Sequence, residues 1–257
     1  MKNKDLLIKS SSIIIMILLW YIFSVWIKSP LILPCPKDVL FSMKKLLFLK
    51  SFYVSVFFTM KRAFISFFIS FFLGQILGFL CGYYSNLKSF FSIPLSIIRI
   101  TPVVSIILMA MFIFTSNSVP VFVSVLMSLP IIVTSVCTGF SKIDKKELDV
   151  AKIYKLSKIQ TFKYVTLPSV KPFIFSGLLS SWGLTWKVVV AGEVLCLPKN
   201  SIGFLLENSQ VHLETATVFA LTIILILISC ILEKTFSVFL NLFTGKRNEE
   251  RGFYSNY

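Results

Sequence analysis

Residues 141–172 read SKIDKKELDVAKIYKLSKIQTFKYVTLPSVKP and separate two long apolar stretches of the chain. Asp144 and Glu147 have the D-x-x-E spacing of a capping box at a helix N-terminus. Ser157 and Gln160 have the equivalent S-x-x-Q spacing. The segment is therefore expected to fold as two short capped helices, not as a flexible linker.

Apolar residues within this segment are spaced so that they could form one buried face. They are Leu148, Ala151, Ile159, Phe162 and Val165. Pro168 and Pro172 predict that the second helix ends before the next apolar stretch, because proline lacks a backbone donor and clashes with the preceding turn. We therefore expect a compact helix–turn–helix plug.

The rest of the chain is dominated by apolar runs. Of its 257 residues, 56% are hydrophobic and only 14% are charged, against about 25% charged residues in soluble domains. Six runs approach the roughly 20 residues that a helix needs to cross a bilayer. They cover about 11–28, 63–84, 93–114, 118–140, 173–195 and 215–236. The composition predicts an all-α membrane protein with six transmembrane helices in a single membrane domain, residues 1–257.

The basic residues indicate the orientation of these spans. If both termini are cytoplasmic, the inner segments carry about twice as many Lys and Arg residues as the outer ones. The stretch Lys37–Lys50 is a basic exception on the outer side, and its helical apolar spacing predicts a helix lying in the membrane interface. The first apolar run lacks a small-x-small cleavage site and is expected to stay as an uncleaved span. The net charge of +15 then indicates contact with membrane lipids, not nucleic acid.

Three glycines in the second run share one helix face and predict close helix packing. They are Gly74, Gly78 and Gly82. Either a seam between subunits or ordinary packing within the chain would account for them. The third and fourth runs contain prolines, which are compatible with kinks.

Trp182, Trp186, Val189 and Glu193 share one face of the fifth run. An ionisable residue inside a span is costly and usually faces a cavity or a partner. We therefore regard Trp182, Trp186 and Glu193 as candidates for a solute pathway. Glu193 is either a gate residue with a cationic partner or a structural charge that reaches the interface, and Lys187 lies on a different face.

The sequence lacks the residue patterns that several kinds of chemistry require. It has no G-x-x-x-x-G-K-[ST] phosphate loop, so any ATP chemistry is expected in another subunit. His212 is its single histidine and is expected in a loop, and its five cysteines show no C-x-x-C spacing. We therefore expect no metal, no cofactor, no catalytic residue and no enzyme activity. A disulfide between Cys35 and Cys196 is left open.

The run from Glu147 to Pro168 resembles the "EAA" loop of binding-protein-dependent ABC permeases. The matching residues are Glu147, Ala151, Ser157, Leu167 and Pro168. The run departs from the pattern at Leu148 and Asp149, where small residues are usual, and at Lys155, where glycine is usual. A non-glycine residue at position 155 must adopt a positive φ at some cost or reshape the turn.

Four further segments resemble permeases of the nitrate, sulfonate and taurine type, in the same order along the chain. They are Leu33–Leu40, Trp186–Glu193, Gly203–Leu205 and Thr217–Ala220. The resemblance extends from about residue 30 to residue 240. It implies a type I importer-like ABC permease fold with a core of about 50–240 and a coupling-helix loop at 141–172.

The resemblance also implies how the protein works and with what partners. Glu147, Ala151, Lys155, Ser157, Leu167 and Pro168 would form the coupling contact with a separate ABC ATPase subunit. The other expected partners are an extracytoplasmic solute-binding protein and a second permease copy, in the bacterial inner membrane. Nitrate, sulfonates, taurine and a pyrimidine precursor of thiamine are the substrate classes that it suggests.

Two other functional classes fit the sequence less well than a permease does. An ion-coupled secondary carrier would need coupling-ion residues near the midplane and internal repeats, and neither is evident. A membrane-bound lipid enzyme would need clustered polar catalytic residues at the interface, and the sequence shows none.

Overall fold

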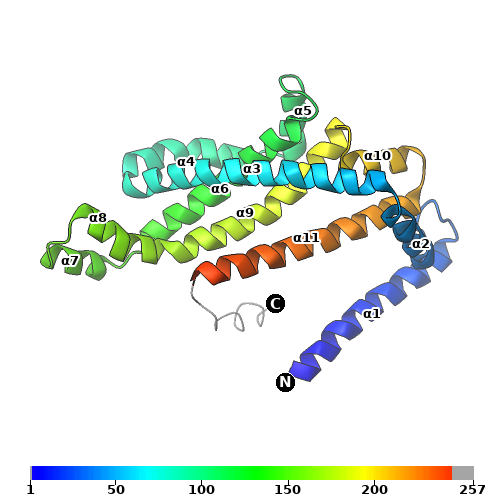
Figure 1. Ribbon diagram of the computed structural model, residues 1–257, viewed down its shortest axis with the longest axis horizontal. Helices are drawn as coiled ribbons and strands as arrows, with labels where there is room; N and C mark the ends of the chain where they lie inside the picture. Colours follow the sequence, from blue (N-terminus) through cyan, green and yellow to red (C-terminus); the bar gives the residue numbers. More distant parts are fainter. Residues whose placement is uncertain (1, 245–257) are drawn as a thin grey trace. The chain divides into compact units, whose positions relative to one another are not determined.

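The computed structural model describes residues 2–244, and in this part of the chain every regular element is a helix (Figure 1). The helices are α1 (Lys2–Ile27), α2 (Pro36–Leu47), α3 (Lys50–Tyr83), α4 (Ser85–Ile100), α5 (Val103–Met111), α6 (Val119–Ser141), α7 (Lys145–Ile153), α8 (Lys158–Thr161), the π-helical turn η1 (Phe162–Thr166), α9 (Leu167–Cys196), α10 (Ile202–Val211) and α11 (Thr215–Thr244). The prediction of an all-α membrane protein is confirmed.

Contacts divide the chain into two compact units. Unit 1 consists of Met1–Thr59 and Leu197–Ile228, and unit 2 of Met60–Cys196 with the segment that begins at Ser229. Helices α3 and α11 each begin in unit 1 and continue into unit 2. The domain prediction, with a core at about 50–240, stays a prediction.

Four helices in the described part are long and apolar enough to cross a membrane. They are Lys50–Tyr83, Val119–Ser141, Lys158–Cys196 and Thr215–Leu240. The pair α4 and α5 would be a fifth span, but it is bent by 95°. Ser11–Ile27 is a shorter apolar helix, so the count of six spans is not confirmed.

The bend between α4 and α5 shows that the span expected over 93–114 is not one straight helix. Thr101 has φ −70° and ψ 130°, which ends α4 in extended backbone. Pro102 follows, and a proline disfavours the helical conformation of the residue before it. The apolar run is therefore divided into two helices with different directions.

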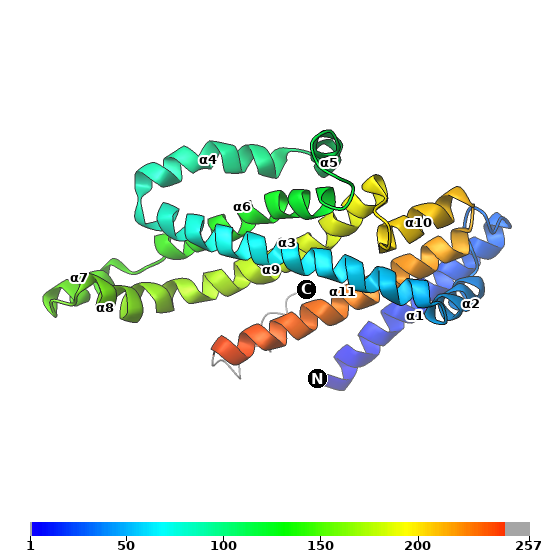
Figure 2. The ribbon, with the colours of Figure 1, turned by 45° about the horizontal axis from the view of Figure 1, so that its top comes forward.

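Helices α6 and α9 form the centre of unit 2 and run side by side, with α7 and α8 at one end (Figure 2). Small residues allow their close approach. A Cβ atom added to Gly177 would lie 2.5 Å from the Cβ of Ser135, and one added to Gly192 would lie 3.0 Å from the Cα of Pro120. Between these points the hydroxyls of Ser128 and Thr185 are 2.8 Å apart. Such small and hydroxylated residues are typical of helix contacts within membranes.

Unit 1 has its own apolar core, built by α1, α2, α10 and the first turns of α3 and α11. Val39 and Leu46 of α2 are buried in it, and Trp20 of α1 stacks on Phe219 with ring centroids 5.8 Å apart. The helix expected over Lys37–Lys50 is thus confirmed as α2, with bounds Pro36–Leu47. Its location in the membrane interface stays a prediction.

Candidate functional site

The first helix of the 141–172 loop begins as the sequence predicts, but its capping differs in one bond. Asp144 is the N-cap of α7 and accepts a hydrogen bond from the backbone N–H of Lys146 at 2.9 Å. The Glu147 side chain accepts a hydrogen bond from the hydroxyl of Ser169 at 3.2 Å, and among the described residues it accepts none from the backbone N–H of Asp144. The Glu147 side chain therefore connects α7 to the start of α9. In a capping box it would have bonded within α7.

The second cap has the full predicted geometry. Ser157 accepts a bond from the backbone N–H of Gln160 at 3.3 Å, and its own backbone N–H donates to the Gln160 side chain at 2.8 Å. This reciprocal pair satisfies two donors that a helix start otherwise leaves without partners. It fixes the direction in which the chain leaves the turn after α7.

Lys155 adopts the left-handed conformation, with φ of 51°. Its backbone N–H bonds to the carbonyl of Lys152 at 3.0 Å, and that of Leu156 bonds to the carbonyl of Ala151 at 3.0 Å. These two bonds define a Schellman motif, in which the residue after the C-cap is usually glycine. The glycine of the family pattern is explained by this geometry, and this chain keeps the turn with a lysine.

The prolines do not end the second helix, and this prediction is wrong. Lys158–Cys196 forms a continuous helix of 39 residues, of which α8, η1 and α9 are parts. In η1 the backbone N–H of Leu167 bonds to the carbonyl of Phe162, a π-type spacing. This wider turn loosens the α-helical ladder just before Pro168, which accommodates a residue without an N–H. The second helix of the loop and the following span are thus one continuous helix, Lys158–Cys196, which we call the rod.

The predicted buried face of the loop is correct in part. Ala151 is buried, and Leu148, Phe162 and Val165 are half-buried. Ile159 is 79% exposed, contrary to the expectation. Ile159 lies in α8, the first turn of the Lys158–Cys196 helix, and none of the four residues of this turn is buried.

The surface of the loop carries exposed apolar side chains among its charged ones. We name four exposed residues the loop patch: Val150, Ile153, Tyr154 and Ile159. Three of them are at least 75% exposed. An apolar patch rimmed by charged residues on an extended loop is typical of a surface that contacts another protein. Sequence reasoning missed this patch, because it assigned the apolar residues of the loop to a buried face.

The predicted coupling residues lie in the same segment as this patch, whose helices α7 and α8 are at one end of the α6–α9 pair (Figure 1). Glu147, Lys155, Ser157 and Pro168 are exposed, Leu167 is half-buried and Ala151 is buried. Four of the six therefore have exposed side chains, and their coupling role stays a prediction.

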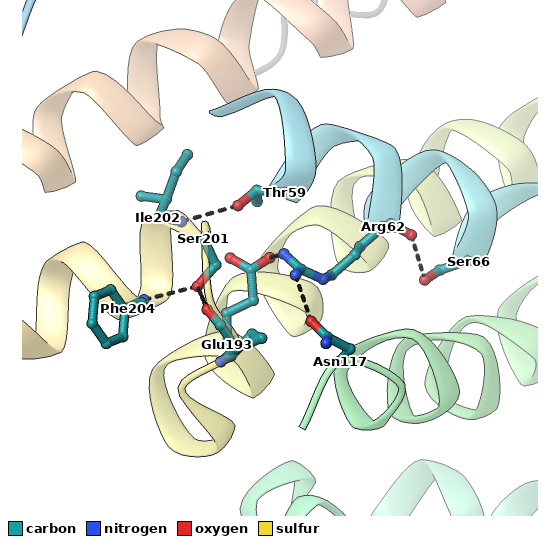
Figure 3. A network of polar contacts seen from close by, with 9 residues as sticks. Thr59, Arg62, Ser66, Asn117, Glu193, Ser201, Ile202 and Phe204 are labelled. Carbon is teal, nitrogen blue, oxygen red and sulfur yellow. Dashed lines mark hydrogen bonds and ion pairs between the residues drawn. The ribbon is translucent and has the colours of Figure 1, made fainter. Parts of the chain in front are cut away.

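Glu193 lies at the other end of α9, and its carboxylate is fully buried. It accepts a hydrogen bond from Nη1 of Arg62 at 2.8 Å, and Nη2 of Arg62 donates to Oδ1 of Asn117 at 2.9 Å (Figure 3). The alternative of a charge reaching the interface is contradicted, and the cationic partner is Arg62. The cluster joins α3, the α5–α6 connection and α9.

The predicted spans place Arg62 just before the second apolar run, in the outer basic segment, and give it no role of its own. The signal that reveals its role is positional. Arg62 directly precedes one predicted apolar run, and Glu193 lies near the end of another that runs in the opposite direction, so both are expected near the same side of the membrane. Opposite charges at matching depths of neighbouring spans are expected to pair.

The other pathway candidates lie in the interior of unit 2. Trp182 and Trp186 are 3% and 4% exposed. Trp182 contacts three phenylalanines, with ring centroids 5.0 Å, 5.1 Å and 5.6 Å away, namely Phe64, Phe67 and Phe236. Lys187 is exposed on another face of α9, as expected. A pathway role for the tryptophans stays a prediction.

The three glycines of α3 face α6 of the same chain. A Cβ atom added to any of them would lie between 2.3 Å and 2.8 Å from a side chain of α6. The opposing residues are Ile132, Val136 and Phe140, in the same order as Gly74, Gly78 and Gly82. This geometry corresponds to packing within the chain.

Unit 1 contains a separate polar contact, which fixes the start of α10. The buried Thr59 hydroxyl accepts from the backbone N–H of Ile202 at 3.0 Å, and Ser201 accepts from that of Phe204 at 3.0 Å (Figure 3). His212 caps the far end of α10 and is exposed there. Among the described residues no group of three His, Cys, Asp or Glu could hold a metal ion, and the five cysteines are free thiols.

Comparison with known proteins decides the family. The model of the family described as "Binding-protein-dependent transport system inner membrane component" matches residues 70–235, more than half of the chain. The chain belongs to this family. It is a family of transport permeases and not of enzymes, and the matched residues include the whole 141–172 loop and the Glu193 end of α9.

Three relatives illustrate the similarity of this permease to characterised members. It is 34% identical over 80 residues to the nitrate import permease protein NrtB of Leptolyngbya laminosa, and 29% identical over 89 residues to the bicarbonate transport system permease protein CmpB of Synechocystis sp.. It is 32% identical over 80 residues to the aliphatic sulfonates transport permease protein SsuC of Escherichia coli, whose name is qualified as provisional. The matched stretches cover 31–35% of this chain and 29–32% of these relatives.

The fold resembles a solved structure titled "Crystal structure of an amino acid ABC transporter with histidines". The TM-score is 0.59 at 19% identity, over 73% of this permease and 90% of that chain. This likeness confirms the expected ABC permease fold.

Proposed function

We propose that this permease is the membrane-spanning subunit of an ATP-driven importer and that the 141–172 loop docks on a separate ATPase subunit. The observation that carries the proposal is the loop patch, an apolar surface at the end of a continuous helix that leads into the membrane. A partner that covers Ile153, Tyr154 and Ile159 would remove their apolar surface from water, which favours association.

The mechanical part of the proposal follows from the rod Lys158–Cys196. A force on the loop passes along this helix, because no break interrupts it between α8 and Cys196. Ser169 links Glu147 to the same rod, so α7 moves with it. ATP-driven motion of the ATPase would then tilt α9 and α6, which pack along each other.

The remaining partners are proposed from the family. An extracytoplasmic solute-binding protein would deliver the solute, and a second copy of this chain would complete the pathway. We place the permease in the bacterial inner membrane with both termini cytoplasmic, as the basic inner segments favour.

The proposed substrate is a small anion. The three relatives above are named for nitrate, bicarbonate and aliphatic sulfonates, each of which is anionic. Taurine and a pyrimidine precursor of thiamine remain the other substrate classes that the sequence suggested. No observation favours the alternative of an ion-coupled secondary carrier.

Copurification tests the proposed ATPase contact. A tagged chain extracted from native membranes in mild detergent is expected to bring down an ABC ATPase subunit. Glu147→Lys should abolish this association and uptake while the protein still inserts, because the reversed charge lies beside the loop patch. Ile153→Ser should weaken the association about tenfold, through loss of buried apolar surface.

The matched control is Asp149→Lys, which makes the same charge change two residues away on α7. Asp149 pairs with Lys152 at the exposed surface, and such pairs contribute little stability. Normal ATPase recovery and uptake in Glu147→Lys would overturn the mechanical role of the loop. Equal losses in Glu147→Lys and Asp149→Lys would indicate a general charge effect.

A further inference from the structure

Unit 2 contains an apolar groove between α3, α9 and α11. Its volume is about 420 Å³, within the range of about 300–1,000 Å³ that is usual for small-molecule sites. Nine of its lining residues are apolar, and one, Lys171, is basic. The apolar ones are Phe67, Phe68, Phe71, Ile174, Phe175, Leu178, Phe236, Phe239 and Leu240.

The floor of the groove consists of buried, packed side chains. Phe67, Leu178 and Leu240 are each at most 7% exposed. The rings of Phe67 and Phe236 meet edge to face, with centroids 5.2 Å apart. Phe68 and Phe239 are each 52% exposed and form the walls. The hollow is therefore preformed by packed aromatic side chains.

Lys171 gives the groove one polar end. Its ammonium lies 5.6 Å from the ring centroid of Phe175, which holds the charge against the aromatic lining. Lys171 is in the second turn of α9, at the end of the 141–172 segment, where the helix enters its apolar stretch. The cation at the edge of the span suits a charged headgroup, and the apolar groove beyond it suits a hydrocarbon chain, so the site matches an amphiphile.

We propose that this groove binds an anionic phospholipid, with an acyl chain along the phenylalanines and the headgroup phosphate at Lys171. The apolar lining cannot satisfy a peptide backbone or a polar solute, whereas an acyl chain has no hydrogen-bonding groups. Basic pockets between transmembrane helices are known to recognise anionic headgroups.

The inference depends on membrane residence and not on the proposed transport function. The purified full chain, stripped of lipid in detergent, is exposed to mixed micelles that contain phosphatidylglycerol or phosphatidylcholine. Native mass spectrometry then counts the lipid molecules that each chain retains. We expect about a fivefold preference for phosphatidylglycerol, which corresponds to about 1 kcal/mol for one basic residue near a headgroup.

Two matched pairs of variants separate the headgroup from the acyl chain. Lys171→Gln should abolish the preference, and Lys187→Gln, an exposed lysine on the same helix but outside the groove, should keep it. Phe68→Ala should lower retention of both lipids. Phe72→Ala, at a position of similar exposure on α3 outside the groove, should not.

Three outcomes would overturn the proposal. The first is equal retention of the two lipids by the unchanged chain. The second is equal behaviour of Lys171→Gln and Lys187→Gln. The third is a change of oligomeric state in Phe68→Ala with unchanged lipid retention, which would assign the groove to a second copy.

Discussion

Arg62 and Glu193 bring two full charges into the interior of unit 2, where each would be costly alone. Their separation of 2.8 Å and the bond from Arg62 to Asn117 compensate much of that cost. The cluster fastens the end of α9 that lies farthest from the 141–172 loop. At the scale of single residues, this ion pair holds the end of the Lys158–Cys196 helix that is opposite the 141–172 loop.

Removing one charge of this pair should be more damaging than removing both. Glu193→Leu leaves the Arg62 charge buried without its partner and should destabilise the protein by about 3–5 kcal/mol. The double variant Arg62→Met with Glu193→Leu should recover most of this loss. Thermal unfolding in one detergent measures both, with Lys152→Met as a control at the exposed Lys152–Asp149 pair. A double variant less stable than Glu193→Leu would show that the pair contributes more than charge compensation.

Lys155 carries a local conformational cost that glycine would avoid. The left-handed conformation costs an ordinary residue roughly 1–2 kcal/mol. Lys155→Gly should therefore strengthen the Schellman bonds and slow hydrogen exchange of the Leu156 amide about fivefold. Lys155→Ala keeps the Cβ atom and should leave the exchange rate close to that of the native chain. Faster exchange in Lys155→Gly would mean that the lysine side chain itself stabilises the turn.

At the scale of elements, the architecture depends on whether each apolar run continues as one helix or is divided into two. The π turn η1 carries the chain past Pro168 without a break, and Thr101–Pro102 divides another apolar run into α4 and α5. Both outcomes involve proline, and backbone geometry next to the proline decides between them. Close approach between helices depends in turn on small residues, as along α3 and α6.

The contact between α3 and α6 predicts a steric penalty at Gly78. A Cβ atom there would lie 2.7 Å from the Cβ of Val136, so Gly78→Val must push the helices apart. We expect a loss of about 1–3 kcal/mol, as for other overpacked interiors, measured by thermal unfolding in detergent. Gly183→Ala is the control, because no atom lies within 4 Å of its added Cβ. It should be neutral or slightly stabilising, since alanine favours a helix, and equal losses at both sites would exclude a steric cause.

At the scale of the whole molecule, the distribution of basic residues predicts the side of the membrane on which each loop lies. The test uses a chain in which all five cysteines are replaced, with a single new cysteine at Lys146 or at Val211, both of which are exposed. An impermeant maleimide should label Val211→Cys on right-side-out vesicles and Lys146→Cys only on inverted ones. The opposite pattern would reverse the proposed orientation and place the loop away from any cytoplasmic ATPase.

The sequence by itself determined the class of the protein and the internal structure of its most informative loop. Apolar run lengths are enough to predict membrane helices, because the bilayer imposes a minimum length on each. The caps at Asp144 and Ser157 were also predictable, since each depends on residues only two or three positions apart. The cost at Lys155 followed from the absence of glycine.

Only the tertiary structure decided the features that depend on residues far apart in the chain. Arg62 and Glu193 are 131 positions apart, so no local pattern pairs them. The exposure of Ile159 depends on where α8 lies, and the groove at Lys171 needs three helices to enclose it. Local hydrogen bonds and hydrophobic length are encoded in short stretches of sequence, whereas buried charge pairs and cavities exist only after distant segments have packed together.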